Sequence, residues 1–200
     1  MRPTLLILAV IFCTATLLQA QDKAAYKIFD KEGKPVTFRE MAEAVAEGDV
    51  VFFGELHNNP IAHWLQLELA KELHKREGEN FVLGAEMFEA DNQLLLNEYL
   101  SGQIDDKVFE DEARVWNNYS TDYKPILEWA REHEVGFVAS NIPRRYASII
   151  SRQGPQAMRS STSKEAKKWI YADSLEVDFG LSQYEKMMQM GGGMHGAAGQ

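Results

Sequence analysis

Cysteine is almost absent from this 200-residue chain, whose only one, Cys13, lies in an apolar stretch near the N-terminus. No thiol follows residue 20. The rest of the chain therefore has no disulfide, no cysteine nucleophile, no zinc–thiolate site and no Cys-ligated haem or iron–sulfur centre. Any metal bound there must be held by His, Glu, Asp, Tyr or Met side chains.

Basic charge is also scarce, since 21 Lys and Arg residues face 30 Asp and Glu residues and the formal net charge is −9. Binding to nucleic-acid phosphates depends on Lys and Arg, so we expect no nucleic-acid partner. After the N-terminal stretch, no apolar run is long enough to be typical of a transmembrane helix. The length suits one domain with a sizeable core.

The first twenty residues are typical of a secretory signal peptide. Arg2 supplies the positive charge, residues 5–18 form the apolar core, and Ala20 ends a suitable cleavage site. The apolar run of about 14 residues is shorter than the ~20 needed to span a bilayer, which favours cleavage over a membrane anchor. We therefore predict a signal peptide over residues 1–20 and a mature domain over residues 21–200. We expect the protein to be exported, and either periplasmic or associated with the outer membrane.

Three short runs of β-branched, aromatic and small residues predict buried strands over 50–53, 81–85 and 136–140. Helical patterns lie between them, and their starts are marked by Thr37 with Glu40 and by Asn59 with Pro60. This alternation predicts an α/β fold, a parallel sheet with helices on both faces. Three strands make a small sheet, and the chain stops at Gln200 without a last hydrophobic element. We therefore expect it to be truncated at the C-terminus.

Polar residues follow each predicted strand: Glu55 and His57 after the first, Glu86 after the second, and residues 141–145 after the third. Ligands of open α/β sheets bind outside the carboxyl ends of the strands, so we expect these residues at one rim. The imidazole and the two carboxylates suit zinc, manganese or ferrous iron and could activate water. On spacing alone an alternative is equally good, in which His57 caps the next helix and Glu55 is its partner.

An aromatic group lies between the second and third predicted strands and comprises Trp116, Tyr119, Tyr123 and Trp129. We expect the tryptophans in the core and the tyrosines, which have polar neighbours, to be reachable from solvent. A phenolate can ligate ferric haem. The remaining helical histidines, His63, His74 and His133, are expected at the surface.

The C-terminal tail is rich in Met and Gly and contains His195. Its methionines could hold a soft metal such as Cu(I) together with His195, or could simply fill an amphipathic helix end. The glycines at 191, 193 and 196 match a dinucleotide-binding spacing, but no strand precedes them, so we reject that interpretation. A loop that donates His195 as a ligand fits better.

Four of these segments, taken in order, resemble the ChaN-like family of haem-binding uptake proteins, which is related to the Tiki, TraB and erythromycin-esterase proteins. The segments are Gly54–His57, Gly84–Phe88, Trp116–Pro125 and Ala139–Arg144. The resemblance covers residues 46–199. It implies an exported α/β protein that binds iron-protoporphyrin in bacterial iron acquisition. It also implies a homodimer that encloses haem and an outer-membrane haem or iron receptor as partners.

The resemblance also points to motif positions. Gly54 and His57 match a first G-x-x-H motif, Glu86 matches the central acid, and Gly192 with His195 matches a second G-x-x-H. In the Tiki-like relatives these positions suggest metal-dependent hydrolysis. ChaN-like chains continue past the His-Gly segment into further helices that this chain lacks, so its domain is expected to be incomplete.

We therefore expect a haem carrier or uptake accessory rather than an enzyme. Haem is expected to lie against Met87 and Phe88, and Arg144 or Arg145 would pair with its propionates. The sequence does not choose among the candidate iron ligands Tyr119, Tyr123 and His195. The alternative is a hydrolase that holds zinc or manganese through Glu55, His57, Glu86 and His195.

Overall fold

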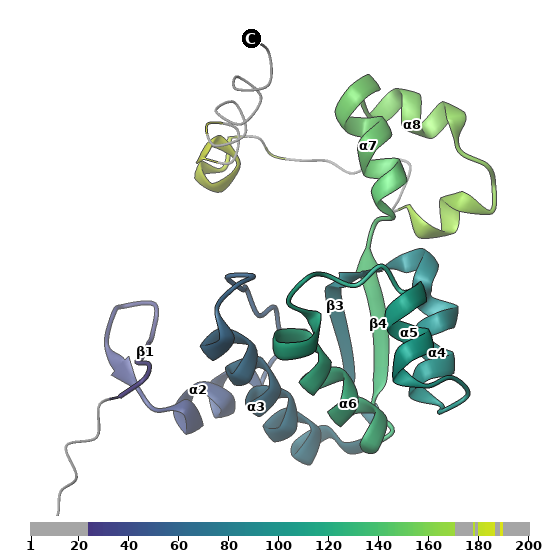
Figure 1. Cartoon of the computed structure of the whole chain (residues 1–200). Coiled ribbons are helices and arrows are strands. Elements are labelled where there is room, and N and C mark those ends of the chain that lie inside the picture. The colour runs from purple at the N-terminus through teal and green to yellow at the C-terminus, as the bar shows by residue number, and fades with distance from the viewer. Residues whose placement is uncertain (1–23, 171–177, 179, 187–188, 190–200) are drawn as a thin grey trace, which may run out of the picture. The chain divides into compact units, whose positions relative to one another are not determined.

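The computed structural model describes residues 24–170, 178, 180–186 and 189 (Figure 1). The predicted signal peptide, the methionines at 187, 188, 190 and 194, and the candidate ligand His195 lie outside the described residues. The chain divides into two compact units, which we describe in turn. The first unit comprises Met1–Leu83, Leu100–Gly102 and Val115–Phe137, and the second comprises Gly84–Tyr99, Gln103–Arg114 and Val138–Gln200.

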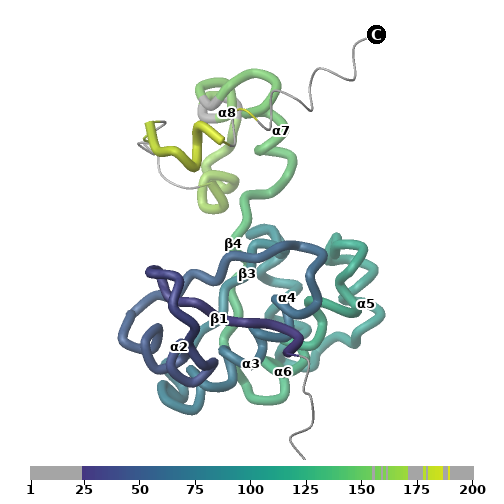
Figure 2. The backbone as a smooth tube through the Cα atoms, turned by 90° about the vertical axis from the view of Figure 1, so that its left-hand side faces the viewer, coloured from purple at the N-terminus to yellow at the C-terminus, as the bar shows by residue number. Residues whose placement is uncertain are grey.

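The first unit contains a small hairpin and three main helices. Its elements are β1 (Ile28–Phe29), β2 (Pro35–Val36), α2 (Phe38–Val45), α3 (Pro60–Glu77), η1 (Gly78–Asn80), the π-helix η3 (Tyr119–Tyr123) and α6 (Lys124–Glu132). Helix α3 packs against α2, η3 and α6, and Figure 2 shows α3 beside α6. Leu69, Tyr119, Tyr123 and Leu127 are buried in the core of this unit.

The second unit has an aromatic centre, to which two of its short helices contribute. Its elements are η2 (Ala90–Asn92), α4 (Gln93–Leu100), α5 (Asp106–Glu112), α7 (Arg144–Gln153), α8 (Pro155–Ser161) and η4 (Ala166–Trp169). Phe109 is fully buried, stacks on Tyr99 at 4.5 Å and meets the Phe88 ring edge-on at 5.8 Å between centroids. Between α8 and η4, the Ser163 hydroxyl accepts from the Ala166 N–H at 3.2 Å.

Strands β3 (Val82–Glu89) and β4 (Gly136–Asn141) pair in parallel, so the predicted α/β class is confirmed. Each begins in the first unit and ends in the second. Along β4, buried Phe137 and Ala139 alternate with Gly136 and Val138, which are exposed. One face of the strand is therefore buried rather than two. None of the described helices is long and apolar enough to cross a membrane.

The strand predicted over residues 50–53 is wrong. The segment belongs to no strand, and its side chains alternate between half-buried Val51 and Phe53 and strongly exposed Val50 and Phe52, which is 94% exposed. A strand needs a neighbour with free N–H and C=O groups, and no described strand pairs with this segment.

The start signals of α2 and α3 are confirmed. Thr37 and Glu40 form a reciprocal capping box at α2. At α3 the Asn59 side-chain oxygen accepts from the N–H groups of Ile61 (3.0 Å) and Ala62 (3.2 Å), and Pro60 follows it. Because Asn59 takes this role, the interpretation of His57 as the helix cap is wrong.

Replacing Asn59 tests how strongly this cap fixes the loop before α3. We expect Asn59→Ala to lower the free energy of unfolding by about 1 kcal/mol, because two helical N–H groups lose their acceptor. Urea denaturation followed by circular dichroism measures the loss. Asn97→Ala, in the exposed interior of α4, is the control and should change stability by less than about 0.5 kcal/mol. Equal stability of the two variants would contradict the capping role.

Candidate functional site

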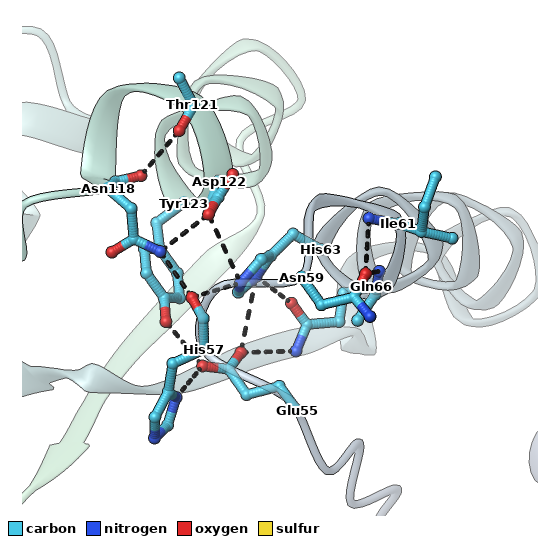
Figure 3. A network of polar contacts seen from close by, with 11 residues as sticks. Glu55, His57, Asn59, Ile61, His63, Gln66, Asn118, Thr121, Asp122 and Tyr123 are labelled. Carbon is cyan, nitrogen blue, oxygen red and sulfur yellow. Dashed lines mark hydrogen bonds and ion pairs between the residues drawn. The ribbon is translucent and has the colours of Figure 1, made fainter.

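The Glu55 carboxylate is the centre of a polar network in the first unit (Figure 3). Its Oε1 accepts from the Tyr123 hydroxyl at 2.7 Å and lies 2.8 Å from Nδ1 of His57. Its Oε2 accepts from the Gln66 amide at 2.8 Å. His57 lies in the loop before α3, Gln66 lies in helix α3, and Tyr123 lies in the π-helix η3. Glu55 therefore connects three segments of the unit.

These contacts change the acidity of both Glu55 and Tyr123. Burial raises the pKa of Glu55, but the hydrogen bonds from Tyr123, Gln66 and His57 outweigh it and hold the pKa below its usual value. Burial, and then the bond to Glu55, raise the pKa of Tyr123 well above that of a free phenol. Glu55 is thus kept as a carboxylate and Tyr123 as a protonated phenol.

His63, which we expected at the surface, is buried under this network, with 4% of its surface exposed. Its Nδ1 lies 3.1 Å from Oε1 of Gln66 and its Nε2 lies 3.2 Å from the His57 carbonyl oxygen. The Gln66 amide nitrogen donates to Glu55, so both His63 nitrogens face acceptors. Oε2 of Glu55 lies 3.6 Å from Nδ1 of His63, so the buried ring is surrounded by oxygen atoms.

The backbone of the loop is clamped from two sides. The Asn118 side-chain amide donates to the His57 carbonyl at 2.6 Å, and His63 meets the same oxygen. Asn118 is held in turn by Asp122 at 2.8 Å, and Nε2 of His63 lies 3.9 Å from the Asp122 carboxylate. Asn118 immediately precedes the π-helix, a rare geometry that is frequent at functional sites.

This clamp presents the His57 ring outward. The side chain is 58% exposed, and its Nδ1 faces Glu55 while its edge meets Trp116 at 4.9 Å between centroids. Because the carboxylate only accepts, the contact is satisfied by a hydrogen on Nδ1, and in that tautomer the lone pair of the ring lies on Nε2. Among the described residues no group bonds to Nε2. A carboxylate–imidazole pair of this kind can ligate a metal or take a proton from a substrate.

Two carboxylates of the second unit hold its arginines. Glu89, only 5% exposed, accepts from Arg114 at 3.0 Å and from the Arg144 guanidinium and backbone N–H. Asp91 accepts from Arg114 at 2.7 Å and from Arg145. Arg144 and Arg145, predicted from the sequence to meet haem propionates, thus already have carboxylate partners.

The other predicted site residues have mixed surroundings. Met87 and Phe88 are core residues of the second unit, and Glu86 is exposed on β3. Tyr119 and Tyr123 are each 3% exposed, so the expectation that they are reachable from solvent is wrong. Both tyrosines lie at the ends of the π-helix η3, four residues apart, and are its buried residues.

The common rim stays a prediction, since its members belong to different units. Glu55 and His57 belong to the first unit, whereas Glu86, Asn141 and the two arginines belong to the second. Within the described part of the chain, no group of three or more His, Cys, Asp or Glu side chains could hold a metal ion.

Sequence reasoning missed His63, Gln66 and Asn118. Helical spacing could have found the first two, because His63 and Gln66 lie three residues apart and share a face of α3 with buried Ala70. The larger apolar residues Ile61 and Trp64 of the same helix are 36% and 45% exposed, so apolar character alone does not mark its inner face. No local signal marks Asn118, whose partner lies 61 residues away in the sequence.

Removing the Tyr123 hydroxyl tests the network. We expect Tyr123→Phe to lower the free energy of unfolding at pH 7 by about 1 kcal/mol, because a half-buried carboxylate loses a donor. The Glu55 pKa is depressed in the folded state, so its contribution is present above the ordinary Glu pKa and is lost as the pH falls. The deficit should therefore shrink in urea titrations near pH 4. Tyr119→Phe is the control, and its deficit should not depend on pH in this range. A constant deficit for Tyr123→Phe would contradict the role of Glu55.

Comparison with known proteins gives one match. The sequence model of the family described as haem-binding uptake, Tiki superfamily, ChaN, matches residues 41–200. No curated protein and no solved structure matches the chain. The match covers most of the chain, including the Glu55 network and both strands of the parallel sheet. The chain therefore belongs to the ChaN family of haem-binding uptake proteins within the Tiki superfamily.

Proposed function

We propose that this chain binds haem as cargo and that His57 is its iron ligand. The observation that carries the proposal is the exposed His57 ring, whose Nδ1 faces the Glu55 carboxylate while no described group bonds to its Nε2. Imidazole is a common axial ligand of haem iron, and a carboxylate on the other ring nitrogen fixes its orientation and raises its basicity. The donor chemistry therefore fits haem.

The surroundings of His57 also fit a flat, largely apolar ligand. Leu56, the preceding residue, is 68% exposed, and the Trp116 ring meets the His57 ring edge-on. Burying such surface against a porphyrin contributes through the hydrophobic effect. Both residues belong to the first unit, so this argument needs no contribution from the second.

Tyr123 is a weaker ligand than the sequence indicated. A tyrosine binds ferric haem as phenolate. Burial and the Glu55 carboxylate raise the pKa of Tyr123 and so oppose that form. Tyr119 is as deeply buried as Tyr123. Among the described candidates, His57 alone combines exposure with an oriented lone pair.

Haem binding by an exported protein would serve bacterial haem or iron uptake. We propose export because residues 1–20 are typical of a signal peptide. A homodimer and an outer-membrane receptor are the partners that such a carrier would need. Pairing of the propionates with Arg144 or Arg145 would require these side chains to share their N–H groups with Glu89 and Asp91.

A haemin titration followed by absorption spectroscopy tests this proposal. The protein should shift the Soret band at a near-stoichiometric ratio. His57→Ala should weaken binding at least about ten-fold, because the iron loses its ligand. His133→Ala, which removes another exposed histidine, is the matched control and should bind as the unmodified chain does.

The titration has two contrary outcomes. No Soret shift with the unmodified chain would refute haem binding altogether. A normal shift with His57→Ala and a lost one with Tyr119→Phe would move the ligand to Tyr119.

A second candidate is the metal-dependent hydrolase, and the same Glu55–His57 pair favours it. An imidazole backed by a carboxylate can take a proton from water, and a metal ion would supply Lewis-acid activation of the substrate. This candidate expects zinc or manganese to copurify and His57→Ala to abolish hydrolysis. Metal analysis at background level in protein that binds haemin would remove it.

A further inference from the structure

The segment from residue 144 to residue 170, which we call the basic segment, has a charge opposite to that of the chain. It contains helices α7, α8 and η4. It carries seven of the 21 basic residues and only one of the 30 acidic residues, Glu165. Its formal charge is +6, whereas the whole chain carries −9. Such a strong local reversal marks a surface for an anionic partner.

Arg144 and Arg145 of this segment pair with Glu89 and Asp91, but four of its other cations differ from the lysines of α3 and α5. On α3, the Lys71 Nζ lies 2.8 Å from Oε1 of Glu68, and the Lys75 Nζ lies 2.6 Å from Oε1 of Glu72. Lys107 on α5 pairs with Asp111 in the same way. These lysines are neutralised on their own helices.

In the basic segment, Lys164, Lys167 and Lys168 are exposed, and none makes an ion pair within 4 Å to a described carboxylate. Arg152 is exposed too, and its guanidinium donates to the carbonyl of Ser148 at 3.2 Å rather than to an acid. Among the residues that the structure describes, these four cations have no close carboxylate partner, although the charge of Lys168 acts on nearby Glu165.

An aromatic ring lies among these cations. Trp169 is half-buried, with the Lys168 ammonium 4.9 Å and the Arg145 guanidinium 5.5 Å from its ring centroid. Tryptophan has an apolar body and a polar N–H, and it is enriched at membrane–water interfaces. Lysine and arginine beside it place positive charge at the level of lipid headgroups.

The cations are held on a packed support. Helices α7 and α8 contact each other, and Met158 and Ala166 are buried, at 6% and 5% exposure. Helix α7 is amphipathic, with half-buried Ile149 and Ile150 between exposed arginines. A basic amphipathic helix with an adjacent tryptophan is typical of a membrane-surface element.

From these observations we propose that the basic segment binds the headgroups of anionic phospholipids and holds the protein at a membrane surface. The rest of the chain carries the other 14 basic and 29 acidic residues and would repel an extended polyanion such as RNA. A bilayer presents its charge to one face only and so avoids this repulsion. The proposal does not depend on haem binding.

Cosedimentation of the full chain with lipid vesicles tests the proposal. One set of vesicles is phosphatidylcholine, and the other contains equal parts of phosphatidylcholine and phosphatidylglycerol. We expect binding to the anionic set that weakens as salt is raised, because salt screens the attraction. The apolar residues 5–18 would bind both sets alike, so the difference between the sets reports the charges.

The variant Lys164→Ala/Lys167→Ala/Lys168→Ala should lower this affinity about 100-fold, since each basic residue near an anionic surface contributes a factor of roughly five. Lys71→Ala/Lys75→Ala/Lys107→Ala changes the net charge equally and is the matched control, which should bind almost as the unmodified chain does. Equal binding to both vesicle sets, or equal loss in both variants, would overturn the proposal. So would binding of an RNA oligonucleotide, lost in the first variant, without vesicle binding.

Discussion

The carboxylate of Glu55 is the group on which the site of the first unit depends. It receives hydrogen bonds from Tyr123 and Gln66 and faces Nδ1 of His57, so three segments of the unit are fixed to one side chain. Burial opposes its charge, and these donors together with nearby His63 overcome that opposition. The orientation of the His57 ring therefore depends on the position of the Glu55 carboxylate. We expect the loss of a donor to Glu55 to change that orientation.

The predictions from the sequence were most accurate for features that depend only on neighbouring residues. The capping box at Thr37, the cap and proline before α3, and the pairing of His57 with Glu55 need only neighbouring residues, and all are present. The α/β class followed from the alternation of helical and extended patterns. The run over residues 50–53 failed because strand formation depends on a partner that composition does not reveal.

Prediction failed most often where tertiary contacts decide the surroundings of a polar residue. His63 and Tyr123 are polar residues that the sequence placed at the surface, yet neighbouring side chains supply acceptors that compensate for the loss of water. Glu89 was passed over in favour of Glu86, although Glu89 is the buried carboxylate that binds two arginines. A polar residue beside a strand end can face inward or outward, and only its partners decide which.

The contacts that close the site join residues far apart in the chain. Asn118 meets the His57 carbonyl across 61 positions, and Tyr123 meets Glu55 across 68. Closing contacts of such separation costs more chain entropy than closing local ones. An unfolded chain that carries His57 lacks the hydrogen bonds that hold its backbone and orient its ring. The oriented imidazole is therefore a property of the folded first unit and not of the motif alone.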